Sequence, residues 1–332
     1  MIKVDTCPIC KGIGFSSFLY CADHSVSHET FPLVRCDTCS FLMTSPRPAD
    51  TQLAKYYMSE AYTSHIKDGK SVFDSVYLFA RSFTLKWKLS LIRRYHSSRN
   101  GQLLDFGCGV GEFLKISAKN GWSITGIEPS EVARTNADPA VQPFILPSST
   151  DIQEKSKTFD AITAWHVLEH VPNLNENIAE LKGMLQPNGT MFIAVPNHNS
   201  WDAKHYAEYW AAYDVPRHLW HFNIQSMTQL LSAHSLTVVS VLPMRLDAYY
   251  VSLLSEQYLG RTPVVRLTNT LINGFRSNYL ARKNKEYSSL IYIVKKWRHF
   301  VTVICFFIHS LYCRAQDKPR PQGGRVIAFP QH

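Results

Sequence analysis

Short apolar runs and segments with helical spacing alternate through the middle of the chain. Six apolar runs have the length of buried strands: 102–106, 123–127, part of 141–146, 159–164, 190–195 and 236–242. Helical spacing predicts helices after residue 111, beginning within 165–171, over 179–185 and over 224–234. This alternation of strands and helices predicts an α/β fold.

Helical spacing continues on both sides of this block. Aromatic-rich segments at 51–57 and 72–95 predict helices that join the N-terminal region to the α/β fold. Residues 245–286 are predicted to be helical, and 288–294 is the best candidate for an antiparallel seventh strand. The segment 201–222 carries six aromatic residues from Trp201 to Trp220. We expect it to form a loop that walls the substrate site at the carboxyl ends of the strands, where open α/β folds bind ligands.

A glycine-rich loop follows the first strand. Gly107, Gly109 and Gly111 have no Cβ and permit positive φ, so a ligand can lie directly against the backbone where the next helix begins. The second strand ends on Glu128, 23 residues after Asp105, where a carboxylate could bind both hydroxyls of a ribose. These features predict a nucleotide-like cofactor at the ends of the first two strands.

Four segments together resemble the class I S-adenosylmethionine-dependent methyltransferases, with a methyltransferase type 11/23-like domain. They are DFGCGVG at 105–111, the acid of GIEPS at 126–130, FDAITAWHVLEHV at 159–171 and NGTMFIAVPN at 188–197. A dinucleotide dehydrogenase would share only the first strand, loop and helix and the ribose acid. The resemblance covers about 101–244 and implies a Rossmann-like seven-stranded sheet with S-adenosylmethionine as the cofactor.

The resemblance also implies which residues hold the cofactor. The expected contacts are Asp105, Gly107, Cys108, Gly109, Gly111, Glu128, Pro129 and Trp165. Glu128 would accept from both ribose hydroxyls, while Asp105 would order the glycine loop. In the family an acid often follows the third strand and helps to hold the adenine, but PSSTD takes that place at 147–151, so the adenine contact stays unassigned.

Two Cys-x-x-Cys pairs near the N-terminus predict a structural zinc site. Cys7 and Cys10 are separated from Cys36 and Cys39 by 25 residues, and four thiolates from two such turns suit tetrahedral zinc. A redox pair is the alternative, but no thioredoxin-like βαβ pattern surrounds either motif. Because four protein ligands leave no open position, this zinc is expected to fold its segment and take no part in chemistry.

A group rich in histidine is the candidate catalytic site. It consists of His166, Glu169 and His170 after the fourth strand, with His218 and His221 from the segment 201–222, which we call the wall segment. In a helix, the spacing i, i+3, i+4 would place the first three side chains on one face. They resemble the acid-x-x-acid-His signature of metal-assisted O-methyltransferases, with His166 in place of the first acid. Three interpretations stay open: a second divalent metal that polarises an acceptor hydroxyl, a histidine general base oriented by Glu169, and a structural role.

Positive charge is concentrated near the C-terminus. Residues 261–332 contain 13 Lys and Arg against Glu286 and Asp317, although the whole chain carries only +9. The apolar run at 299–309 is shorter than the roughly 20 residues that span a bilayer. A helix packed on its own domain or on a twin subunit is the simpler account of this region, and peripheral contact of 261–314 with an anionic membrane is the alternative. The N-terminus has no signal-like apolar run, which predicts a cytoplasmic protein that reaches the membrane only from its inner face.

These observations predict four parts in the chain. They are a zinc-binding ribbon at 1–45, a helical linker or cap at 46–100, a methyltransferase domain at 101–296 with a helical insertion at 245–286, and a basic, apolar tail at 297–332. The leading function is methylation, in the first place O-methylation, of a small-molecule, sugar or lipid-linked intermediate. An RNA methyltransferase and a catalytically silent scaffold are the alternatives. A nucleic-acid partner is disfavoured because no recognised RNA-binding motif occurs.

Overall fold

The computed structural model describes residues 1–57, 72–96, 100–150, 152 and 157–297. The chain divides into a compact unit at 1–296 and a second unit at 297–332, and the description below concerns the first unit. Of the predicted membrane contact at 261–314, residues 298–314 lie outside the described residues. Within the described ranges, no helix combines the length and the apolar character needed to cross a membrane.

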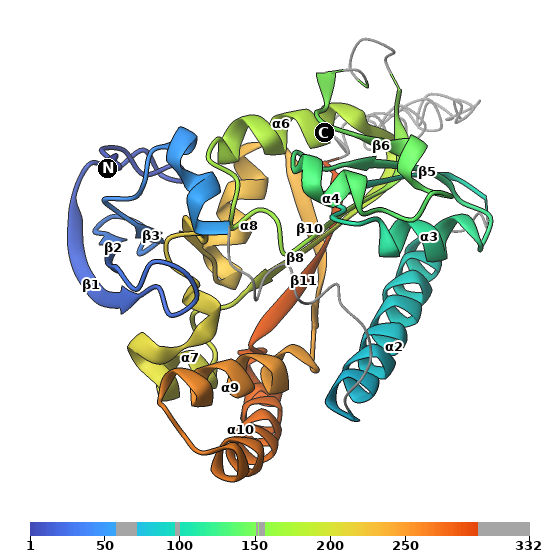
Figure 1. Ribbon diagram of the computed structural model, residues 1–332. Helices are drawn as coiled ribbons and strands as arrows, with labels where there is room; N and C mark the ends of the chain where they lie inside the picture. The colour runs from blue at the N-terminus through green and yellow to red at the C-terminus, as the bar shows by residue number, and fades with distance from the viewer. Residues whose placement is uncertain (58–71, 97–99, 151, 153–156, 298–332) are drawn as a thin grey trace, which may run out of the picture. The chain divides into compact units, whose positions relative to one another are not determined.

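A seven-stranded sheet forms the centre of this unit (Figure 1). In spatial order its strands are β10 (Leu236–Pro243), β11 (Ser289–Lys296), β8 (Leu185–Pro196), β7 (Phe159–Trp165), β4 (Gln102–Phe106), β5 (Ser123–Ile127) and β6 (Ile145–Leu146). Neighbouring strands from β8 to β6 run parallel, whereas β11 is antiparallel to both β8 and β10. The predicted α/β class is confirmed, as is the antiparallel seventh strand.

Helices cover both faces of this sheet (Figure 1). One face is covered by α6 (Leu174–Met184) and α8 (Ile224–Ala233), and the other by α2 (Val72–Tyr95) and α3 (Glu112–Ala118). Short helices α4 (Glu131–Thr135) and η2 (Gln142–Phe144) connect β5 to β6. Successive strand residues point to opposite faces, so each strand supplies side chains to two cores.

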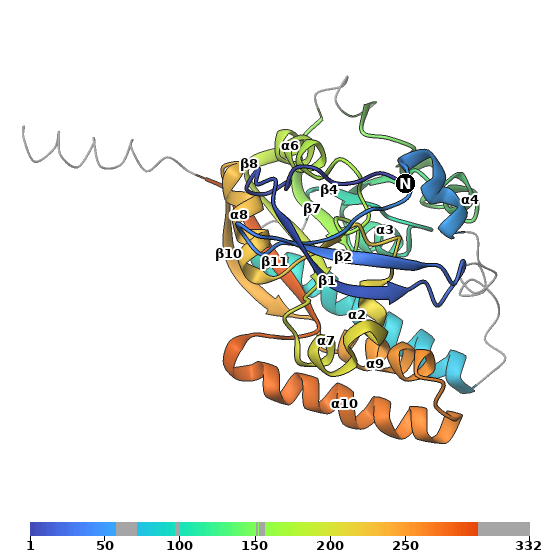
Figure 2. The ribbon, with the colours of Figure 1, turned by 90° about the vertical axis from the view of Figure 1, so that its left-hand side faces the viewer.

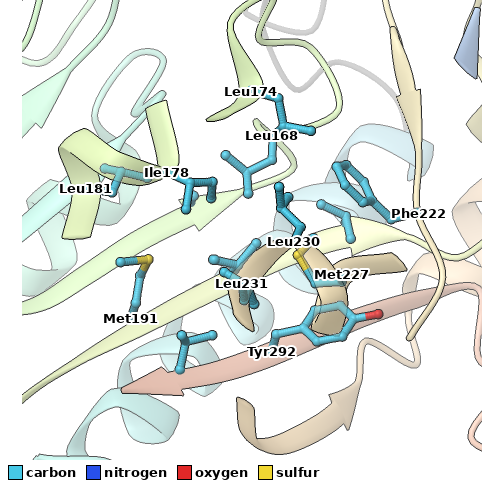
Figure 3. Close-up of a cluster of buried hydrophobic side chains, with 14 of the residues drawn as sticks. Leu168, Leu174, Ile178, Leu181, Met191, Phe222, Met227, Leu230, Leu231 and Tyr292 are labelled. Atoms are coloured by element: carbon cyan, nitrogen blue, oxygen red, sulfur yellow. The ribbon is translucent and has the colours of Figure 1, made fainter. Parts of the chain in front are cut away.

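The core between the sheet and the helices α6 and α8 is shown in Figure 3. From the helices it receives Leu174, Ile178, Leu181, Met227, Leu230 and Leu231, all at most 2% exposed. These residues recur at three- and four-residue spacing, which gives each helix one apolar stripe. Met191 of β8 and Tyr292 of β11 meet them from the sheet.

The segment after β7 is not the predicted helix. Residues 166–173 form a turn, and α6 begins only after it. His166 has a left-handed backbone with φ of 57°, and Pro172 disfavours helical backbone at the residue before it. The prediction that His166, Glu169 and His170 share one face of a helix is therefore wrong. β8 also begins earlier than predicted, so that 187–189 belongs to the strand.

A second sheet of four antiparallel strands joins the N-terminal region to the wall segment. Its order is β1 (Phe15–Ala22), β2 (Thr30–Cys36), β3 (Leu42–Thr44) and β9 (Trp220–His221). In the pairing of β3 with β9, Leu42 lies opposite His221 and Met43 opposite Trp220. The N-terminal module thus takes one of its strands from a segment about 180 residues further along the chain.

The wall segment between β8 and α8 is folded rather than an open loop. It contains α7 (Trp201–Tyr206), the short helices η3 (Ala207–Tyr209) and η4 (Ala211–Tyr213), and β9. Its aromatic side chains share a core with Phe31 and Leu33 of β2, with Val251, and with Tyr56 of the 3-10 helix η1 (Asp50–Tyr57). After β10 come α9 (Asp247–Tyr258) and α10 (Pro263–Asn284), the helices predicted over 245–286.

Candidate functional site

The glycine loop lies between β4 and α3. Gly107, Gly109 and Gly111 have left-handed backbones, with φ of 71°, 56° and 75°. A Cβ on Gly107 would lie 2.5 Å from Val167, and one on Gly111 would lie 3.0 Å from Val141, so close packing excludes side chains at both positions. A Cβ on Gly109 would meet no atom of the described residues within 4 Å. Gly109 therefore faces open space, where a ligand can approach the backbone.

Glu128 holds this loop from the end of β5. Its Oε2 accepts from the N–H of Gly109 and its Oε1 accepts from the N–H of Ser130, each at 2.9 Å. Both oxygens keep a second lone pair, so a ribose diol could still donate to them. The guanidinium of Arg134 donates to the carbonyls of Glu128 and Pro129 at 2.7 Å and fixes the turn that follows.

Asp105 lies beneath the loop. It is 2% exposed and accepts from the Oγ1 of Thr163 at 2.6 Å. Burial raises the pKa of its carboxyl to about 7, although the Thr163 hydrogen bond and the charge of Lys88 act in the opposite direction. Lys88 comes from α2, and its Nζ lies 4.5 Å from the centre of the Trp165 ring. Lys88 was not among the predicted site residues, because nothing in a predicted helix shows which of its residues faces the site.

Cys108 is a packing residue of the same loop. Its Sγ would lie only 2.6 Å from a Cβ on Gly126, so the thiol fills the space beside that glycine. Burial raises the pKa of this thiol above its ordinary value and keeps it protonated. Phe113 lies edge-on to the Trp165 ring, with 5.6 Å between ring centres. Cys108 therefore lies within the loop and Trp165 lies beside it. Their contact with the cofactor stays a prediction.

The turn after β7 places His166 between two carboxylates. Its Nδ1 lies 3.3 Å from Oε1 of Glu169, and its Nε2 lies 3.0 Å from Oδ2 of Asp247, the first residue of α9. Burial would lower the pKa of His166, but the interactions with Asp247 and Glu169 outweigh it and raise this pKa to about 9. At neutral pH His166 is therefore an imidazolium, and it cannot serve as a general base there.

His170 and His218 stand edge to face, with 4.5 Å between ring centres. The Nδ1 of His170 lies 3.2 Å from the carbonyl of Arg217 and 3.0 Å from the hydroxyl of Tyr57. The Nδ1 of His218 lies 2.9 Å from the carbonyl of Ala212. Since a carbonyl can only accept, this geometry assigns the proton to Nδ1 in both rings and leaves Nε2 as an acceptor.

Glu169 joins these two histidines. Its carboxylate and the two rings offer ligand atoms that lie within 4.8 Å of one another. Glu169 is 1% exposed, and neither of its carboxylate oxygens has a hydrogen-bond partner among the described residues. Burial alone would raise the pKa of Glu169, but the ion pair with His166 lowers it. The imidazolium of His166 compensates the buried charge from the Oε1 side, and Oε2 can still accept a second cation or a hydrogen-bond donor.

The structure brings together most, but not all, of the predicted catalytic residues. His166, Glu169, His170 and His218 meet, and Asp247 and Tyr57 join them from distant segments of the chain. His221 does not join this group. Thr44 Oγ1 donates to the carbonyl of His218 at 2.7 Å, so the Nε2 of His221, at 3.1 Å, must donate to that hydroxyl.

Arg217 ties the wall segment to the N-terminal module. Its guanidinium donates to Asp214 at 2.6 Å, to Asp23 at 3.0 Å and to the carbonyl of Tyr56 at 2.9 Å. Its side chain is 5% exposed and that of Asp23 is fully buried. The adjoining backbone N–H of Leu219 donates to the carbonyl of Glu169 at 2.7 Å. The position of the turn at 166–173 therefore depends on this ion network.

Replacing Arg217 by Met is expected to lower the free energy of unfolding by about 3–5 kcal/mol, because it removes the cation that compensates the fully buried charge of Asp23 and pairs with Asp214. Chemical denaturation followed by circular dichroism measures this change. Lys204→Met is the matched control, since Lys204 and Glu286 form an exposed ion pair at 3.3 Å, and such pairs contribute at most about 1 kcal/mol. Equal free energies of unfolding in the two variants would show that the Arg217 ion network does not stabilise the wall segment.

The four predicted cysteines form one cluster. The sulfurs of Cys7 and Cys39 lie 3.6 Å apart, and those of Cys10 and Cys36 lie 3.5 Å apart. Tetrahedral zinc with bonds of about 2.3 Å would place sulfurs about 3.8 Å apart, so the cluster fits this ion. The residue after each pair has a left-handed backbone and donates its N–H to the carbonyl of the first cysteine: Lys11 to Cys7, and Ser40 to Cys36.

The glycine loop and the turn after β7 lie within a part of the chain that matches a known family model. Residues 81–241 match the family model described as a methyltransferase domain. The chain is 35% identical over 106 residues to the ubiquinone biosynthesis O-methyltransferase of Photobacterium profundum. The aligned region covers 30% of this chain and 45% of that protein. It is 34% identical over 110 residues to the protein of the same name from Actinobacillus pleuropneumoniae, covering 29% and 46%. The chain thus spans about half the length of these relatives.

Among solved structures, the chain is similar to a 1,6-didemethyltoxoflavin-N1-methyltransferase from Burkholderia thailandensis. The TM-score is 0.45 at 15% sequence identity, with 79% of this chain and 98% of that chain covered.

Proposed function

We propose that this chain, which contains a class I S-adenosylmethionine-dependent methyltransferase domain, transfers the methyl group of S-adenosylmethionine to an oxygen of a small-molecule acceptor. The observation that carries the proposal is the group of Glu169, His170 and His218, placed just beyond the glycine loop. Gly107 packs on Val167, so the loop and the turn that bears this group are in contact. A methyl donor on the loop and an acceptor at the turn would then be neighbours.

The family implies the cofactor, and the loop has the features to bind it. Gly109 leaves room for the cofactor against the backbone, and Glu128 has lone pairs free for two ribose hydroxyls. Asp105 supports the loop from below and does not reach the surface. Lys88 lies over Trp165, where it would face the carboxylate end of the cofactor.

We propose a divalent cation as the partner of Glu169, His170 and His218. The fit rests on Glu169, whose oxygens accept no hydrogen bond from the described residues although Oε1 is ion-paired with His166, and on two imidazoles whose Nδ1 faces a backbone carbonyl, the arrangement that orients metal-ligating histidines. Such an ion would polarise the acceptor hydroxyl and lower its pKa. The residues of the chain would orient the metal ligands. His166 would hold Glu169 in place, and Arg217 would hold the wall segment that carries His218.

A general base at this site is the competing proposal. Burial and the neighbouring His218 lower the pKa of His170 to about 4, so His170 is neutral at pH 7 but weakly basic. His166 is protonated at that pH, as described above. Neither histidine is matched to proton abstraction near neutrality, where a base with a pKa close to the working pH is most effective. His218 would have to act as the base.

The acceptor class is proposed from the relatives. Two of them are named as O-methyltransferases of ubiquinone biosynthesis, which favours an oxygen acceptor on a small or lipid-linked molecule. The test is to incubate the protein with methyl-labelled S-adenosylmethionine and separate host fractions of polar metabolites, lipids and RNA. Label in RNA would support an RNA methyltransferase instead, and cofactor binding without label in any fraction would support a silent scaffold.

Replacing Gly109 by Val is expected to abolish measurable binding of S-adenosylmethionine, because the branched side chain would fill the open space beside the loop. Gly260→Val is the matched control: its φ is +70° and a Cβ there also meets nothing within 4 Å, so it carries similar backbone strain without touching the loop. Titration calorimetry should show parent-like binding in the control. Equal binding in the two variants would contradict the assignment of the loop.

Replacing Glu128 by Ala is expected to weaken cofactor binding about a hundredfold or more. Two charge-assisted hydrogen bonds are each worth about 1.5–3 kcal/mol, and tenfold in affinity corresponds to about 1.4 kcal/mol. The same calorimetric titration measures the change. Undiminished affinity would remove Glu128 from the cofactor site.

A further inference from the structure

Helix α10 has its polar face inside and its apolar face outside. The buried positions recur at helical spacing and carry polar or small side chains: Thr270, Asn273, Gly274, Ser277 and Ala281. The opposite face carries exposed apolar side chains, which we call the α10 stripe: Val264, Leu267, Leu271, Ile272, Phe275 and Tyr279. An amphipathic helix on a water-soluble surface has the reverse orientation.

Buried hydrogen bonds hold α10 in this orientation. Asn273 donates to the hydroxyl of Tyr206 at 2.9 Å and to Glu256 at 3.2 Å. Ser277 donates to Asp202 at 2.9 Å. The carboxylates of Asp202 and Glu256 are at most 2% exposed, so rotation of the helix would leave both without these partners.

Close packing against α9 fixes the same orientation. A Cβ on Gly274 would lie 2.4 Å from the ring of Tyr249, so the two helices touch where α10 has no side chain. Figure 2 shows α10 at the lower edge of the unit, with α7 and α9 between it and the strands. The stripe is therefore a fixed outer surface.

The stripe is large for a surface that meets only water. Leu271 is 58% exposed and Phe275 is 60% exposed, and the ring of Phe275 stacks on that of Tyr279 with 6.1 Å between centres. Contiguous apolar patches of this kind mark surfaces that bind a protein or a membrane. Charge decides between these two partners.

Basic residues surround the stripe without any acidic residue. Between Glu256 and Glu286 the chain contains no Asp or Glu, but it contains six basic residues: Arg261, Arg266, Arg276, Arg282, Lys283 and Lys285. Two copies of this segment packed face to face would bring twelve such charges together, with no acidic residue of 257–285 to neutralise them. An anionic lipid surface attracts the same charges while it accepts the apolar side chains.

We propose that the α10 stripe docks on an anionic lipid surface, with α10 lying parallel to the membrane plane. The apolar side chains would enter the boundary between headgroups and acyl chains, and the long arginine and lysine side chains would reach the lipid phosphates. This site does not depend on the proposed methyl transfer. It assigns the predicted membrane contact to residues within 261–285.

Flotation of the full chain with vesicles tests the proposal. Binding to vesicles of phosphatidylglycerol and phosphatidylcholine is expected to exceed binding to phosphatidylcholine alone and to weaken as salt rises. Leu271→Ser with Phe275→Ser should reduce the partition coefficient at least about tenfold, because two large apolar side chains are lost from the interface. Arg276→Gln with Arg282→Gln should reduce it about fivefold for each charge removed.

The matched control changes two apolar residues that have a similar exposed fraction but lie outside α10. Tyr20 of β1 is 64% exposed and Val239 of β10 is 49% exposed, so Tyr20→Ser with Val239→Ser should float like the parent. Unaltered circular dichroism shows that each variant is folded. Parent-like flotation of the Leu271→Ser, Phe275→Ser protein would overturn the proposal. So would a stable dimer of the parent that these two substitutions dissociate, since the occupant would then be a second copy.

Discussion

Replacing Cys36 by Ser is expected to remove the metal from the N-terminal module and to unfold it. Apparent binding energies of structural zinc in small modules reach about 10–16 kcal/mol, which is comparable to the whole stability of a domain. The parent should contain about one zinc per chain by metal analysis, because four thiolates form a single tetrahedral site. The variant should lose the metal and become sensitive to proteolysis within 1–45.

The effect should extend to the active site. β3 lies next to the zinc cluster and pairs with β9, and Thr44 of β3 donates to the carbonyl of His218 at 2.7 Å. Methyl transfer should therefore fall with the zinc, while the glycine loop keeps its affinity for the cofactor. Cys21→Ala is the control, since Cys21 is buried in a different core and lies outside the four-cysteine cluster. A Cys36→Ser protein with full zinc and parent-like protease resistance would refute the site.

Replacing Glu169 by Gln is expected to reduce methyl transfer at least about a hundredfold while cofactor binding stays intact. The amide has almost the same shape but lacks the negative charge that would hold a cation or orient a histidine base, and loss of such groups typically reduces rates about 10²–10⁴-fold. His170→Ala and His218→Ala should have similar effects. Initial rates with labelled cofactor, measured beside calorimetry on the same samples, separate catalysis from binding.

A chelator distinguishes the two chemical proposals for this group. The chelator is used at a concentration at which metal analysis still finds the zinc of the four cysteines, because loss of that zinc is itself expected to lower methyl transfer. If Glu169, His170 and His218 hold a divalent ion, this treatment should inactivate the parent and added metal should restore it. If His218 is a base, the treatment should have no effect. His221→Gln should retain turnover, because His221 donates to Thr44 and lies outside the group. Near-normal rates in the Glu169, His170 and His218 variants together would leave the group a structural role only.

Local patterns in the sequence are sufficient to predict much of the central fold. A helix was predicted over 224–234, and α8 is observed as Ile224–Ala233. The helix α2 has the predicted bounds, Val72–Tyr95. Both elements are long enough for the 3.6-residue period to be repeated several times. The glycine loop was predictable because its φ angles admit few other residues.

The turn at 166–173 shows why periodicity alone can mislead. The spacing of His166, Glu169 and His170 fits a helix, yet Pro172 stands two residues later and opposes helical backbone at Val171. That signal was present in the sequence. Two of these residues nevertheless gather with His218, because the turn packs against the wall segment and not because they share a helix.

The remaining parts of the site come from contacts between distant segments. Asp247 reaches His166 from the start of α9, and Tyr57 reaches His170 from η1. No local pattern marks Asp247, since a single acid at the start of a helix is common, and nothing local pairs Tyr57 with His170. β9 is only two residues long, which is too short for alternation to identify it.

The pairing of β3 with β9 has a consequence for the order of events during synthesis. Residue 221 follows residue 42 by about 180 residues, and at translation rates of about 5–20 residues per second β3 must wait roughly 10–40 s for its partner strand. Until then β3 is an unpaired edge, the kind of strand that recruits other chains. The four cysteines are complete at residue 39, so zinc could fold the emerging hairpin during this interval. Metal supply would then govern how much of the newly made protein escapes aggregation.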